Sequence, residues 1–156
     1  MPEEVREAMP SSGQPLGHFA ILDPLGKGGM GEVFLAEDTI LDRKVALKFL
    51  SEESLQDPVA RKRFLREAKS AAALDHPFIC QVYETGEADD EPFIAMEFVE
   101  GESLQHRLKR GPLPLEEALR VGCEIAEALE AAHEQGIAHR DLKPANIMLA
   151  ANGHAK

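Results

Sequence analysis

The hydrophobic pattern of the chain changes near Gly101, and this change limits the fold more than any other feature. Before it, short apolar runs such as Val45–Leu50, separated by glycine-rich and aspartate-rich turns, predict strands. After it, apolar residues recur at helical spacing over 115–132, with Pro114 before them and Gly136 after them. A group of strands followed by helices indicates an α+β fold.

The composition fits one soluble domain and excludes some functions. The chain has 156 residues and a formal net charge of −11, from 28 acidic and 17 basic residues. This charge disfavours a protein that binds nucleic-acid backbones, which requires a basic face. No apolar run has the length of a membrane span, and the N-terminus lacks the apolar segment of a signal peptide. We therefore expect a cytoplasmic protein without a membrane segment.

The chain divides into three parts. Residues 1–17 contain three prolines and no periodicity, so we predict a flexible N-terminal tail. Residues 18–101 are expected to form a five-stranded antiparallel sheet with one inserted helix, which begins at Asp57 and Pro58. Residues 102–156 are expected to be mainly helical.

A glycine cluster follows the first predicted strand. Residues 26–31 satisfy the pattern G-x-G-x-x-G. In a dinucleotide-binding fold this motif opens a helix, but Glu32–Ala36 has the character of a strand, which excludes that fold. A glycine-rich hairpin can still bring backbone N–H groups close to a phosphate. An ordinary glycine-rich hairpin remains an alternative at this point.

One lysine lies in a predicted buried strand. Lys48 needs a partner there, because burying an unpaired ammonium is costly. The partner is either a ligand phosphate or a carboxylate, and Glu67 flanks the apolar face of the predicted helix. The alternatives are that the head of Lys48 reaches water and that Glu67 belongs to a solvated helix face.

The stretch 139–146 is the most specific in the chain. It places five polar side chains within eight positions, between a predicted helix and an apolar run. Asp141 is a candidate general base, Lys143 a cation for developing negative charge, and Asn146 an oxygen ligand for magnesium. The alternative is a polar surface loop.

With these motifs in this order, the chain resembles the eukaryotic-like (Hanks-type) serine/threonine protein kinases, especially the bacterial members. The resemblance implies a kinase-like fold, with the N-lobe and hinge over 18–101 and a partial C-lobe over 102–156. It also implies ATP and Mg²⁺ as cofactors and a protein with serine or threonine as substrate. Lys143 followed by Pro144 is similar to the serine/threonine subclass rather than to the tyrosine subclass.

The resemblance assigns roles residue by residue. Asp141, Lys143, Lys48 and Glu67 would be catalytic, with Glu67 paired to Lys48, and Asn146 would bind the metal. Met96 would be the gatekeeper next to the adenine. The residues that would contact ATP are Leu25, Gly26, Lys27, Gly28, Gly29, Met30, Gly31, Glu32, Val33, Ala46, Lys48, Met96, Glu97 and Val99.

The sequence departs from the family, because it lacks the activation loop, the Ala-Pro-Glu segment, the later C-lobe helices and, above all, the Asp-Phe-Gly segment. That segment carries the main magnesium-binding aspartate of the family, so we expect residues 1–156 to be inactive by themselves. The alternative is a non-catalytic nucleotide-binding or regulatory fragment. Small-molecule phosphotransferases of the aminoglycoside-kinase kind are not expected to show both the glycine motif and the loop at 139–146.

Overall fold

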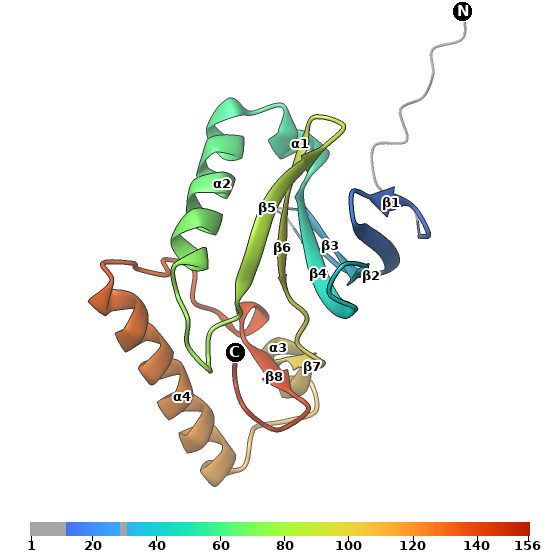
Figure 1. Ribbon diagram of the computed structural model, residues 1–156. Coiled ribbons are helices and arrows are strands. Elements are labelled where there is room, and N and C mark those ends of the chain that lie inside the picture. The colour runs from blue at the N-terminus through green and yellow to red at the C-terminus, as the bar shows by residue number, and fades with distance from the viewer. Residues whose placement is uncertain (1–11, 29–30) are drawn as a thin grey trace, which may run out of the picture. The chain divides into compact units, whose positions relative to one another are not determined.

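The computed structural model describes residues 12–28 and 31–156 (Figure 1). The chain forms two compact units. The first contains the described residues up to Lys69 together with Val82–Phe98, and the second contains Ser70–Gln81 and Val99–Lys156. The predicted boundary at Gly101 thus lies close to the change of unit after Phe98. Residues 70–81, which we placed in the first part, group with the second unit.

The first unit is built on one antiparallel sheet with the strand order β1-β2-β3-β4-β6-β5. Its strands are β1 (Pro15–Leu16), β2 (Phe19–Gly28), β3 (Gly31–Asp38), β4 (Arg43–Leu50), β5 (Val82–Ala88) and β6 (Glu91–Glu97). The sheet therefore has six strands where we predicted five, and the additional strand is β1.

The predicted tail is wrong for the residues just before β2. Leu16 is buried and pairs with Phe19, and the N–H of Gly13 donates to the carbonyl oxygen of Ile21 at 2.8 Å. Burial of the Leu16 side chain in the sheet core stabilises the pairing of this segment with β2. Residues 1–11 of the predicted tail lie outside the described residues.

One face of this sheet carries the core of the first unit. Alternate residues of the strands point to it, and among them are Phe34, Phe49 and Phe93. The rings of Phe34 and Phe49 meet edge to face, with 5.8 Å between their centroids. Because the buried residues of this face are mainly apolar, a shift by one residue would expose them, which favours one register.

Two helices follow β4: α1 (Glu52–Leu55) and α2 (Pro58–Ala72). The predicted start of α2 is confirmed, because the Asp57 carboxylate accepts the N–H of Val59 at 2.9 Å and Pro58 is the first helical residue. Phe64 and Ala68 are its buried residues.

The second unit contains β7 (Gly101–Ser103), α3 (Leu104–Leu108), α4 (Leu115–Glu134), the 3-10 helix η1 (Pro144–Asn146) and β8 (Met148–Ala150). Strands β7 and β8 pair antiparallel. The core of this unit consists of Leu104, Val121, Ile147, Leu149 and Ala155.

Helix α4 has the predicted ends. It begins after Pro114, and Gly136 follows it with φ of 74°, donating its N–H to the carbonyl oxygen of His133. The predicted apolar stripe is only partly buried, because Leu115 and Leu119 are 74% and 60% exposed. Within the described part of the chain, no helix combines the length and apolar character that crossing a bilayer requires.

Candidate active-site residues

The predicted glycine loop joins β2 and β3 as a hairpin. Gly26 pairs with Val33, Lys27 with Glu32, and Gly28 with Gly31. The motif therefore connects two strands and does not open a helix, as its sequence context predicted. Gly29 and Met30, both predicted to contact ATP, lie outside the described residues.

The structure explains why Gly31 has no side chain. It pairs with Leu50 of β4, and a Cβ atom at this position would lie 1.7 Å from the carbonyl oxygen of Phe49. A backbone atom cannot move aside without displacing the strand. Gly26 is different, since a Cβ atom there meets no atom within 4 Å. The pairing of β3 with β4 thus depends on glycine at position 31.

An ion pair links the two strands next to the hairpin tip. The Nζ atom of Lys27 lies 2.5 Å from Oε1 of Glu32, its cross-strand partner. The hydrogen bond and the charge of Glu32 raise the pKa of the exposed Lys27. Both residues were predicted only as ATP contacts, so this pairing is a finding of the structure.

Four predicted nucleotide-binding residues share the face of the sheet opposite the core. Val33 of β3 lies beside Lys48 of β4, and Ala46 of β4 lies beside Met96 of β6. Because side chains alternate along a strand, Ala46 and Lys48 point to the same face, away from the apolar cluster. The register of three strands therefore brings these four side chains together.

The predicted pair between Lys48 and Glu67 is not formed in this structure. No ion pair joins them among the residues that are described, and Glu67 is exposed on α2. The reason lies in the helix, which buries Phe64 and Ala68 and presents Glu67 to solvent. Lys48 is half-buried.

The remaining predicted ATP contacts are spread along the chain. Leu25 is 46% exposed on β2, at an irregularity of the β2–β3 pairing. Glu97 is the last residue of β6, opposite Val45, while Val99 belongs to the second unit.

In the second unit, the structure brings together the three predicted side chains of the loop at 139–146. The Nζ atom of Lys143 lies 3.2 Å from Oδ2 of Asp141. The Nδ2 atom of Asn146 donates to the same carboxylate oxygen at 3.1 Å and to the backbone oxygen of Asp141 at 2.8 Å. Since the nitrogen side of the amide faces Asp141, its oxygen, the atom that binds cations, faces the other way.

These neighbours set the charge of Asp141. The hydrogen bond from Lys143 has the largest effect and lowers the pKa of this carboxyl group. Desolvation opposes it, and the hydrogen bond from Asn146 and the positive charge of Lys143 lower the pKa further. The side chain is 58% exposed. Asp141 is therefore an ionised, accessible hydrogen-bond acceptor at neutral pH.

The backbone of the loop is fixed by local contacts. Arg140 has φ of 64°, and the N–H of Asp141 donates to Nδ1 of His139 at 3.2 Å. Pro144 starts the turn η1, and Ile147 directly after it is buried. A left-handed residue followed by a short 3-10 turn holds Asp141 and Asn146 on the same side of the loop.

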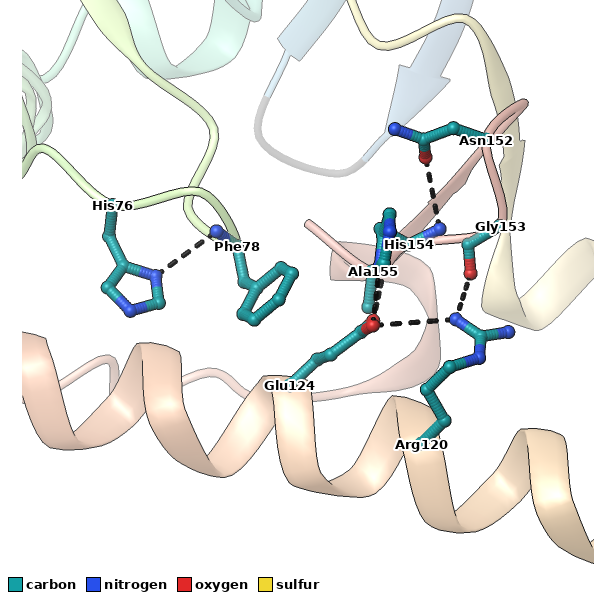
Figure 2. A network of polar contacts seen from close by, with 8 residues as sticks. All are labelled: His76, Phe78, Arg120, Glu124, Asn152, Gly153, His154 and Ala155. Atoms are coloured by element: carbon teal, nitrogen blue, oxygen red, sulfur yellow. Dashed lines mark hydrogen bonds and ion pairs between the residues drawn. The ribbon is translucent and has the colours of Figure 1, made fainter.

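A second cluster, missed in the sequence analysis, holds the segment that follows β8 (Figure 2). Glu124 of α4 is buried, and its carboxylate accepts the N–H of Ala155 at 2.7 Å and contacts Nδ1 of His154 at 2.6 Å. Arg120, one turn earlier, lies 3.5 Å from the same carboxylate and donates to the carbonyl oxygen of Gly153. This cluster joins α4 to the chain just beyond β8.

Burial by itself raises the pKa of Glu124, but the hydrogen bonds from Ala155 and His154 and the charges of His154 and Arg120 outweigh it and lower the pKa. The sequence contained a signal for the buried position of Glu124. Glu124 lies three residues after Val121 and one before Ile125, so a charge falls within the apolar stripe of the predicted helix.

The ring of His154 also contacts a loop of the same unit. Its centroid lies 5.8 Å from that of Phe78, whose backbone N–H donates to Nδ1 of His76 at 3.1 Å (Figure 2). The ring contact between Phe78 and His154 thus joins the loop at 76–78 to the segment after β8.

Comparison with known proteins places this arrangement in a family. The protein kinase domain family matches residues 19–156. The chain is 44% identical over 133 residues to the serine/threonine-protein kinase pkn2 of Myxococcus xanthus, covering 85% of this chain and 16% of that protein. It is 46% identical over 141 residues to the serine/threonine-protein kinase PrkC of Bacillus subtilis, covering 90% of this chain and 22% of that protein.

A solved structure supports the same assignment. The kinase domain of PknI from Mycobacterium tuberculosis superposes with a TM-score of 0.81 at 38% identity, covering 92% of this chain and 58% of that chain. The chain thus spans about a fifth of the length of the curated relatives. The predicted resemblance to bacterial Hanks-type kinases is confirmed, and the chain belongs to the protein kinase domain family.

Proposed function

We propose that the residues of this chain serve the transfer of phosphate from ATP to serine and threonine hydroxyl groups of proteins. The observation that carries the proposal is the cluster of Asp141, Lys143 and Asn146, in which a carboxylate, an ammonium and an amide meet within 3.2 Å. The names of the relatives supply the class of acceptor, since both are serine/threonine-protein kinases.

Each member of this cluster has a role in the proposed reaction. The ionised Asp141 accepts the hydrogen of the attacking hydroxyl group and orients its oxygen. Lys143 places a positive charge beside the same carboxylate, where negative charge develops on the transferred group. The amide oxygen of Asn146 faces away from Asp141 and suits a hard cation.

The first unit supports nucleotide binding. Gly26 leaves the backbone of the hairpin uncovered, and Lys48 is half-buried without a protein partner in the described part of the chain. An ammonium in that position suits a phosphate oxygen, which would remove the cost of leaving it unpaired. Ala46 and Met96, on the same face of the sheet, offer apolar contact to an adenine.

The residues also fit the metal that the family uses. Asn146 would hold the ion through its amide oxygen, a donor type that magnesium accepts. A bound magnesium ion would offset the negative charge of the phosphate groups. Glu67 and Lys48 remain proposed as a catalytic pair, which requires a rotation or shift of α2 from its position here.

A second candidate function is nucleotide binding without catalysis. The separation of Lys48 from Glu67 favours it, because the pair that would fix the lysine for catalysis is not made. A lysine without a carboxylate partner still binds a phosphate.

One assay distinguishes the two candidates. Transfer of labelled γ-phosphate to a protein acceptor, with label recovered on serine or threonine and lost in Asp141→Asn, supports catalysis. ATP binding that requires Lys48 but not Asp141, without transfer, favours the second candidate and agrees with the expectation that residues 1–156 are inactive by themselves. Absence of both ATP binding and transfer contradicts both candidates.

A further inference from the structure

Helix α2 differs sharply in charge from the rest of the chain. It carries five basic residues and one acidic residue, a net charge of +4, whereas the whole chain has −11, so the remainder has −15. Four of its cations are exposed, Arg63 among them. The other three, Lys62, Arg66 and Lys69, share one side of the helix, and we call these three the basic stripe. At 100° per residue they fall within about 60° of the helix circumference, on the side away from the buried Phe64.

Helix α4 carries the opposite arrangement. Glu127, Glu130 and Glu134 are exposed on its C-terminal half, and we call them the acidic stripe. They also fall within about 60° of the circumference. The buried Glu124 is separate from this stripe, because its carboxylate is occupied by His154 and Ala155.

Both stripes lack counter-charges of their own. None of their side chains has an ion pair or hydrogen bond within residues 12–28 and 31–156, unlike Arg120, which pairs with Glu124 on α4. Within each stripe, like charges stand three and four residues apart, a spacing that destabilises a helix. Glu134 also lies in the last turn of α4, where the helix dipole disfavours an anion.

The spacings of the two stripes match in reverse order. The basic stripe advances by four and then three residues, about 6 Å and then 4.5 Å along the axis. The acidic stripe, read backwards from Glu134, also advances by four and then three. Two antiparallel helices would therefore place Lys62 beside Glu134, Arg66 beside Glu130 and Lys69 beside Glu127, each cation level with one anion.

From this match we propose that the basic stripe is a docking surface for a second copy of the chain, whose acidic stripe it binds as an antiparallel helix pair. The chain itself supplies both surfaces, with complementary charge and equal spacing. Ion pairs between exposed side chains are individually weak, and two copies of charge −11 repel each other at long range. The association is therefore weak and confined to contact distance.

The test measures the mass of the 156-residue chain by sedimentation equilibrium over a concentration series. We expect self-association that decreases when the salt is raised to about 1 M, where the screening length is about 3 Å. The variants Lys62→Glu/Arg66→Glu and Glu130→Lys/Glu134→Lys should each weaken it by at least about tenfold. Matched controls with equal charge changes outside the stripes, Lys44→Glu/Lys109→Glu and Glu52→Lys/Glu53→Lys, should leave it within about threefold of the original.

The decisive arm mixes the two stripe variants. In the mixture, an acidic α2 meets a basic α4 and a basic α2 meets an acidic α4, so association should return although each variant alone has lost it. This rescue also shows that both variants are folded. A chain that stays monomeric throughout, association that the stripe variants do not change, or a mixture without rescue would overturn the proposal. The assay reads mass alone, so none of these outcomes bears on phosphate transfer.

Discussion

The two units position their functional side chains in different ways. In the first unit, Val33, Ala46, Lys48 and Met96 are placed by the register of three strands whose other face is an apolar core. In the second unit, Asp141, Lys143 and Asn146 are exposed and contact mainly one another, on a loop that follows α4. The positions of the sheet residues are set by backbone pairing, whereas the positions of the loop residues are set by polar contacts between side chains.

This difference determines which changes should damage each unit. A change that displaces a strand of the sheet moves several candidate ATP contacts together. A change in the second unit acts on the polar contacts of one side chain, because Glu124, Asp141 and Asn146 each bond specific partners. The predictions below run from the largest expected effect to the smallest.

Gly31→Ala should cause the largest loss of stability, about 2–3 kcal/mol, because its Cβ atom would overlap the backbone of β4. Tyr83 is the only tyrosine, no tryptophan is present, and Tyr83 lies in β5, so tyrosine fluorescence during urea unfolding reports on the first unit. The control Gly26→Ala adds a Cβ atom where there is space and should cost less than about 1 kcal/mol. Equal losses in the two variants would contradict the role given to Gly31.

Glu124→Leu should destabilise the second unit by about 1–3 kcal/mol, because it leaves the buried N–H of Ala155 without its acceptor. Hydrogen exchange measured by NMR should show faster exchange of the amide of Ala155 and of the amide of Ala150, which donates to the carbonyl oxygen of His154. Glu127→Leu, on the exposed side of the same helix, serves as the control. Unchanged protection of Ala155 in Glu124→Leu would show that the cluster does not anchor this segment.

The same carboxylate should make the second unit sensitive to acid. The pKa of Glu124 is lowered in the folded chain. Its contribution to the free energy of unfolding is therefore complete above the ordinary pKa of 4.5 and is lost as the pH falls through the pKa of the folded state. Unfolding followed by circular dichroism between pH 7 and about 3 should show this loss, and Glu124→Gln should show less of it. A pH dependence identical in Glu124→Gln and in the unmodified chain would refute this assignment.

Lys143→Met should have the smallest effect on stability, and its direct structural effect is on the titration of Asp141. Without the ammonium, the pKa of Asp141 should rise towards its ordinary value of 3.8. The carboxyl carbon resonance of Asp141 followed by NMR measures this directly. If its midpoint does not move, Lys143 does not set the charge of the candidate base.

The features that could be predicted from the sequence are those that depend on neighbouring residues. The strands, the start of α2 at Asp57 and the glycine at 136 after α4 were predictable, because period, caps and turn residues are local properties. The cluster at 139–146 was predictable in composition, since its three members lie within six residues.

The errors concern contacts between distant parts of the chain. Strand β1 depends on the burial of a single residue, Leu16, among prolines and glycines. The pairing of Glu124 with Ala155 joins residues 31 positions apart, which no local pattern reveals. The predicted pair of Lys48 and Glu67 also joins distant parts of the chain; it is not formed in this structure and stays a prediction.

The central claim is that the sheet face carrying Lys48 binds the phosphate groups of ATP. Calorimetric titration of the chain with ATP and magnesium tests it directly, using Lys48→Met and, as a matched control on the same strand, the exposed Lys44→Met. We predict that Lys48→Met weakens binding at least about tenfold while Lys44→Met leaves it unchanged. Equal affinities in all three proteins, or no binding by the unmodified chain, would contradict the claim.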